Sequence, residues 1–266
     1  MRRTPLFWVT LLLVGVVLVD VAVRVGARQG REPAPAATAD PGAPEPQAPG
    51  APAPRRAPLG AAVPSPEPPS PAVRLARLAL RDRLRAAGPG TYLDSLIRTS
   101  DSIVRRWADG RASLTLALVP GGVKAWDPAY AALVREAAQR WNETGLGPAW
   151  RVVDDSARAD VVVQWVDRFD FARAGQTDLM WDNGGVVRRA YVTLALADQA
   201  DHVLAREDLA AIALHELGHA LGLPHSDAPS DIMFPSTSAG RLSERDRATL
   251  RLLYELPPGS LRDGAP

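Results

Sequence analysis

The chain has 266 residues, with 31 Lys and Arg against 30 Asp and Glu, a net charge of +1, and no cysteine. This balance gives no support for nucleic-acid binding, which depends on an excess of basic side chains. The lack of cysteine excludes disulfides and thiolate metal ligands. The length allows one or two domains.

Residues 1–27 have the features of an export segment. Arg2 and Arg3 precede an apolar run over residues 6–19, as in a signal peptide, and small residues at 25–27 offer a cleavage site. The run can also continue as an uncleaved signal anchor, because a bilayer span needs about 20 mostly apolar residues. We favour the anchor, with the arginines on the cytoplasmic side. Either alternative predicts an extracytoplasmic protein, anchored in the membrane or secreted.

Residues 28–71 are rich in Pro and Ala and nearly free of large apolar side chains. Such a segment cannot bury a core, so we expect a disordered, semi-rigid spacer. A helical segment is predicted next, over residues 72–104, with a helix at 72–87. One stripe of this helix is basic, which favours either a solvated face or contact with anionic lipid headgroups. We prefer the solvated face. The stripe comprises Arg74, Arg77, Arg81 and Arg85.

The remaining chain alternates strand and helix patterns and is long enough for a single α/β core. Asp127 and Pro128 are typical of a helix start, as N-cap and first helical residue. Ser243, followed by Asp246, indicates a capping box for the last helix. Pro257 ends that helix. Strands are predicted at 113–119, 151–153, 160–166, 179–181 and 186–196, and helices at 127–141 and 207–221.

One string, from His215 to His225, has the composition of a metal site. His215 and His219 are four residues apart, so on a helix both imidazoles lie on one face. Glu216 is placed to polarise a water rather than to bind the metal. Gly222 permits a turn with positive φ, which returns His225 as a third ligand. Three protein ligands leave an open position, which is typical of catalytic zinc.

The string fits H-E-x-x-H-x-x-G-x-x-H, the pattern of metzincin metalloproteases. Ser226 follows it, Met233 comes eight residues after His225, and Pro235 follows an aromatic residue. These residues, together with the segment 242–254, resemble the matrixin branch of the metzincins. The resemblance places Met233 as an apolar floor beneath the zinc. Astacin-like and serralysin-like relatives carry a tyrosine at the position of Pro235, so no tyrosine ligand is expected here.

The resemblance implies a zinc metalloendopeptidase domain over residues 105–257, followed by a C-terminal tail at 258–266. Its expected fold is α/β (α+β), a zincin-like mixed twisted sheet of about five strands with three helices. It also implies one catalytic Zn²⁺, with Glu216 as general base and acid. Protein or peptide substrates would lie along an edge strand, contacting Thr177, Asp178, Leu179 and Met180. The pocket wall would come from residues 235–240.

Several alternatives remain beside this reading. An exported zinc-binding module for adhesion or scaffolding, without proteolytic activity, would use the same ligands. His202 is read as a solvated loop residue, which leaves no second all-histidine site. Calcium is conceivable but unsupported, because the spacing of the aspartates is not that of an EF-hand. Those aspartates are Asp154, Asp155, Asp160, Asp198 and Asp201.

The missing cysteine also removes the usual means by which matrixins are kept latent. If residues 72–110 form a pro-segment, a carboxylate would have to approach the metal instead. The candidates are Asp82, Asp94 and Asp101. An ordinary packing helix or linker is the preferred interpretation of this segment, and we expect a monomer.

Overall fold

The computed structural model describes residues 69–98, 102–124, 126–237 and 239–262. All of these lie in one compact unit, Ala61–Pro266. The predicted export segment and the Pro/Ala-rich spacer up to residue 68 lie outside the described residues. Among the helices that are described, none is both long and apolar enough to span a bilayer.

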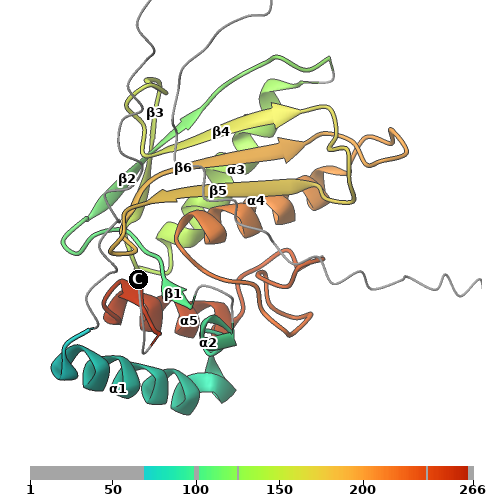
Figure 1. Ribbon diagram of the computed structural model, residues 1–266. Helices are drawn as coiled ribbons and strands as arrows, with labels where there is room; N and C mark the ends of the chain where they lie inside the picture. The colour runs from blue at the N-terminus through green and yellow to red at the C-terminus, as the bar shows by residue number, and fades with distance from the viewer. Residues whose placement is uncertain (1–68, 99–101, 125, 238, 263–266) are drawn as a thin grey trace, which may run out of the picture. The chain divides into compact units, whose positions relative to one another are not determined.

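A five-stranded mixed sheet forms the centre of this unit, in the order β3-β2-β4-β6-β5 (Figure 1). Four strands run parallel and β5 is antiparallel to β6, so β5 is an edge strand with opposite direction. Residues 182–186 connect β5 to β6. The strands are β2 (Ser113–Leu118), β3 (Ala149–Val153), β4 (Val161–Val166), β5 (Gly175–Trp181) and β6 (Val187–Ala195).

Two helices, α3 (Pro128–Asn142) and α4 (Arg206–Ala220), cover one face of this sheet. The Asp127 carboxylate accepts from the Ala129 amide, which confirms the predicted N-cap. Trp141 of α3 is buried, and its indole N–H donates to the Leu214 carbonyl of α4 at 2.9 Å. The third helix predicted for the region from residue 105 onward is α5 (Glu244–Glu255), which begins with the complete Ser243–Asp246 capping box. The predicted sheet and three helices are therefore confirmed.

The segment before residue 105 packs against the same core. It contains α1 (Pro71–Ala87), the 3₁₀ turn Gly88–Gly90 and the short α2 (Ser95–Arg98). Leu84, Tyr92 and Leu93 belong to the main hydrophobic cluster. Two short strands, β1 (Ile103–Val104) and β7 (Gly259–Ser260), pair antiparallel and join this segment to the C-terminal end of the domain. This agrees with the packing helix preferred from the sequence.

Two sequence-based expectations need correction in detail. The strand predicted at 179–181 begins earlier, at Gly175. The prediction was too short because an edge strand is half exposed and lacks a continuous apolar pattern. The basic stripe of α1 is not uniformly solvated. Arg74 and Arg85 are exposed, whereas Arg77 is half-buried and donates to the Arg262 carbonyl at 2.6 Å. The Asp82 carboxylate pairs with Arg85 within α1, and the carboxylate of Asp94, in the turn before α2, pairs with Arg98.

Candidate metal centre

The first two predicted ligands lie on consecutive turns of α4. His215 is buried, and its Nδ1 lies 2.6 Å from the Ile232 carbonyl oxygen. His219 makes the corresponding contact to the Leu223 carbonyl at 2.8 Å. A carbonyl accepts only, so each Nδ1 carries the proton and each Nε2 keeps a free lone pair. Both rings are thus fixed in the tautomer that a metal requires.

Gly222 ends α4 and turns the chain. Its φ is +104°, and its amide donates to the His219 carbonyl at 2.8 Å while the Leu223 amide donates to Gly218 at 3.1 Å. These two bonds form a Schellman motif. A β-carbon at position 222 would lie 2.3 Å from the Arg105 carbonyl oxygen, so only glycine fits. The turn returns His225 to the other two histidines, as predicted.

The three histidines form one cluster whose ligand nitrogens all lie within 4.8 Å of one another. The Nε2 atoms of His219 and His225 are 3.1 Å apart. Two imidazole nitrogens that share a zinc ion at about 2.1 Å each are separated by roughly 3.4 Å in tetrahedral geometry. The donor set and its spacing therefore fit a zinc ion. In the described part of the chain this is the sole such group of His, Cys, Asp and Glu side chains.

The cluster is held in its neutral form. Burial lowers the pKa of His215 and, together with the neighbouring histidines, lowers that of His219 further. Burial also lowers the pKa of His225 to about 4, with a smaller contribution from His215. Neutral imidazole is the form that binds a metal. The environment thus prepares the ligands at neutral pH.

Glu216 comes directly after His215 in α4 and is buried, with its carboxyl in contact with Thr177 of β5. Burial raises the pKa of its carboxyl to about 7, against the effect of a hydrogen bond from Thr177 and the charge of Arg173. The Thr177 hydroxyl lies 2.6 Å from Oε2. Gly175 leaves room for the side chain, since a β-carbon there would lie 2.4 Å from Oε1. Glu216 therefore has a pKa suited to exchange protons near neutrality.

Met233 is fully buried, and its sulfur packs against Gly218 of α4. A β-carbon at Gly218 would lie 2.4 Å from that sulfur, so the methionine approaches the backbone of α4 at the residue before His219. The Met233 carbonyl accepts from the Ser226 amide at 2.8 Å, which closes the loop between them. Pro235, which follows Phe234, is exposed.

The residues predicted to contact substrate lie on the outer edge of the sheet. Asp178 and Met180 are exposed, while Thr177 and Leu179 are half-buried. Among the described residues β6 is the one strand that pairs with β5, so the other edge of β5 carries no described strand and could accept a further one. Thr177 has a contact that the sequence did not predict, since its hydroxyl is directed to Glu216. Gly175 was missed as well, because its importance depends on a contact with a distant helix.

His202 and two of the aspartates considered for calcium, Asp160 and Asp198, form hydrogen bonds with residues outside the three-histidine cluster. His202 is exposed and lies 3.2 Å from the Asp198 carboxylate. Asp198 accepts from the amides of Ala200 and His202, within its own loop. Asp160 accepts from the amide and hydroxyl of Thr115. Both carboxylates thus have hydrogen-bond donors among their described neighbours.

A mixed sheet that covers a helix bearing H-E-x-x-H, with the third histidine after a glycine turn, defines the metzincin class. The chain matches the model of the family Peptidase_M10, matrixin, over residues 106–255. It therefore belongs to the matrixin family.

Individual relatives match over shorter stretches. Matrix metalloproteinase-25 of Homo sapiens is 48% identical over 58 residues, which is 19% of this chain and 10% of that protein. Matrix metalloproteinase-2 of Drosophila melanogaster is 49% identical over 47 residues, which is 16% of this chain and 6% of that protein. Metalloendoproteinase 5-MMP of Arabidopsis thaliana is 36% identical over 84 residues, which is 30% of this chain and 21% of that protein. The chain thus spans about a fifth or less of the length of these relatives.

Proposed function

We propose that this protein is a zinc-dependent metalloendopeptidase. The observation that carries the proposal is Glu216, a buried carboxyl that comes directly after His215 on α4, the helix that supplies two members of the three-histidine cluster. A structural zinc site has four protein ligands, whereas this cluster has three, and a structural site has no use for a neighbouring base. Membership of the matrixin family supports the same activity.

Zinc bound by His215, His219 and His225 would supply Lewis-acid chemistry, which polarises the scissile carbonyl and lowers the pKa of an attacking water. Glu216 takes the proton from that water as general base. It then gives a proton to the leaving amine as general acid. A pKa of about 7 allows both steps at neutral pH, because the carboxyl can then hold or release a proton at little cost.

The free edge of β5 is the proposed binding surface for substrate. An extended peptide can add to this edge by main-chain hydrogen bonds, which give affinity with little sequence preference. The contacting residues would be Thr177, Asp178, Leu179 and Met180. Residues 235–240 would form a wall of the pocket beside the cleaved bond. The substrates would then be extended or unfolded segments of proteins.

We further propose that the protein acts outside the cytoplasm, anchored by its N-terminal segment or released after cleavage. The sequence of residues 1–27 supports this, and the names of several relatives, such as matrix metalloproteinases, agree with it. The catalytic domain is assigned to residues 105–257 and the tail to 258–266.

The test is a comparison of the purified full chain with its Glu216→Gln variant. Zinc content is measured first, and cleavage of an unfolded protein and of a mixed peptide library follows. We expect one zinc per chain in both proteins and cleavage by the wild type only. A zinc-loaded wild type that cleaves nothing would favour the adhesion or scaffold alternative. Equal cleavage by Glu216→Gln would refute the role of Glu216.

A further inference from the structure

A buried carboxylate, Asp246, links the segment that precedes the matrixin region to the metal centre. Asp246 has no exposed surface. Its Oδ1 accepts from the Tyr92 hydroxyl at 2.9 Å, and its Oδ2 accepts from the Ile232 amide at 2.9 Å and the Ser243 amide at 2.8 Å. A buried carboxylate needs such donors, because an unsatisfied one carries a large desolvation penalty.

Ile232 connects Asp246 to His215, the first of the three histidines. The Ile232 amide donates to Asp246, and the Ile232 carbonyl accepts from His215 Nδ1 at 2.6 Å. Two hydrogen bonds on one residue therefore fix the backbone that orients the His215 ring. Partners of this kind set the tautomer and direction of a metal-binding histidine. Tyr92 lies outside residues 106–255, the region matched by the matrixin model.

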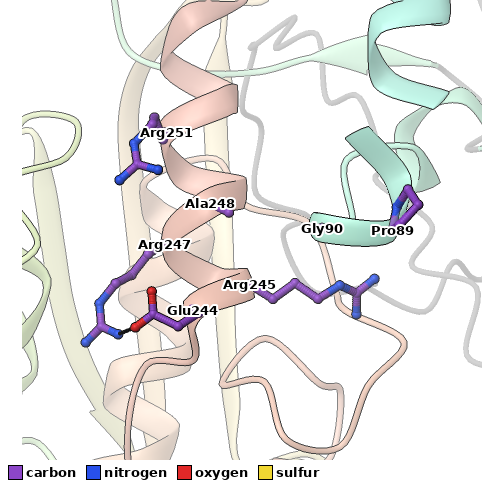
Figure 2. Close-up of a pocket in the computed structure, with 7 residues that line it drawn as sticks. All are labelled: Pro89, Gly90, Glu244, Arg245, Arg247, Ala248 and Arg251. Carbon is purple, nitrogen blue, oxygen red and sulfur yellow. Dashed lines mark hydrogen bonds and ion pairs between the residues drawn. The ribbon is translucent and has the colours of Figure 1, made fainter. Parts of the chain in front are cut away.

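Arg245 makes a second connection between the same segments. Its guanidinium donates twice to the Thr91 carbonyl, at 2.9 and 3.2 Å, and donates to the Asp231 carboxylate at 3.0 Å. Asp231 also accepts from the Ser226 hydroxyl, next to His225. Figure 2 shows Arg245 directed toward the turn that carries Pro89 and Gly90, while Arg247 and Arg251 point away from it. The turn is thus held at the start of α5.

Tyr92 is suited to a permanent role in this arrangement. It is 2% exposed, so its ring cannot leave the core without a large loss of buried apolar area. Burial, followed by the charge of Asp246, raises the pKa of its hydroxyl well above the usual range, so it remains a donor. Its amide also donates to Thr249 Oγ1 of α5 at 3.3 Å.

We propose that Tyr92 is a positioning residue of the metal centre, which holds His215 in its ligating orientation through Asp246 and Ile232. The inference rests on the zinc site proposed above. The segment that contains Tyr92 then supports the site, in contrast to an inhibitory pro-segment. The functional unit of this chain accordingly begins before residue 105, at the helices that precede β1.

The test is the full-length Tyr92→Phe variant, which removes the hydroxyl and keeps the ring. Zinc affinity is measured by competition with a chelator, and ligand geometry by the visible absorption of the Co²⁺-loaded protein. We expect affinity to fall about tenfold, the lower range for loss of a residue that orients a ligand. We also expect the Co²⁺ bands to shift.

Thr115→Val is the matched control, because the Thr115 hydroxyl also donates to a carboxylate, Asp160, at 2.8 Å. We expect Thr115→Val to lower the melting temperature and to leave zinc affinity and the Co²⁺ spectrum unchanged. If Tyr92→Phe lowers the melting temperature alone and binds zinc like the wild type, Tyr92 has only a structural role and the inference is overturned. A wild type that binds no zinc would instead defeat the proposed function.

A double-mutant cycle tests the route. If Tyr92 acts through Asp246, Tyr92→Phe should weaken zinc binding no further in an Asp246→Asn background. Additive losses of affinity would overturn the route. Should Asp246→Asn fail to fold, the comparison of Tyr92→Phe with Thr115→Val still decides the inference.

Discussion

The hydroxyl of Thr177, on the edge strand β5, donates a hydrogen bond of 2.6 Å to Oε2 of Glu216 on α4. The two residues are 39 positions apart in the chain. The bond favours the ionised carboxylate and so lowers the pKa of Glu216, while burial raises it to about 7. The edge strand proposed to bind substrate therefore also tunes the proposed catalytic base.

Thr177→Val removes this hydrogen bond and should raise the pKa of Glu216. Fewer molecules then carry the carboxylate at neutral pH, so the acid limb of kcat/KM should move to higher pH. A shift of about one pH unit is expected, since a hydrogen bond to a charged group contributes at least about 1.5 kcal/mol. Thr177→Ser keeps the hydroxyl and should keep the limb. An unmoved limb in Thr177→Val would contradict this.

Gly175→Ala should displace Glu216. The added β-carbon would lie 2.4 Å from Oε1 and 2.7 Å from Cγ, so the whole side chain must move. A misplacement of about 1 Å can cost roughly a hundredfold in rate. We expect that loss in kcat/KM with zinc content unchanged. Gly90→Ala, where no atom lies within 4 Å, is the control and should be active. Full activity of Gly175→Ala would exclude the steric argument.

Gly222→Ala should destabilise the turn that carries His225. The residue has φ +104°, and its β-carbon would lie 2.3 Å from the Arg105 carbonyl oxygen. Gly110→Ala is a matched control, because Gly110 has φ +75° and open space around it. The control should lose about 1–2 kcal/mol of unfolding free energy, the cost of left-handed backbone for a residue with a β-carbon. Gly222→Ala should lose more and should also bind zinc more weakly. If urea titrations show the same loss of unfolding free energy for Gly222→Ala and Gly110→Ala, the overlap with the Arg105 carbonyl oxygen is relieved by a backbone shift and the prediction is wrong.

Zinc affinity should depend on pH in a characteristic way. The lowered pKa values mean that the histidines stay unprotonated below their usual range. We expect the affinity to stay near-constant as the pH falls through about 6.5, the ordinary pKa of histidine, and to fall only below it, toward the pKa of His225 at about 4. The Glu216→Gln background keeps that carboxyl from titrating. A decline that begins at about pH 6.5, as for exposed histidines, would show that burial does not prepare the ligands.

Local signals in the sequence predicted much of the fold. Asp127 with Pro128 gave the start of α3, and Ser243 with Asp246 gave the capping box of α5, because caps involve residues within one turn. The spacing from His215 to His225 predicted the three-histidine cluster, because one helix and the turn after it bring these residues together. Less was predicted for β5, since its exposed edge weakens the apolar alternation from which strands are read.

The sequence by itself predicted the three-histidine cluster, the proposed base and the family, because these depend on residue type at fixed short spacing. Only the tertiary structure decided the environment of each group. Burial raises the pKa of Glu216, and Asp246 joins Tyr92 to the backbone that orients His215. Such contacts unite residues far apart in the chain. They arise from packing of the core, which no local periodicity encodes.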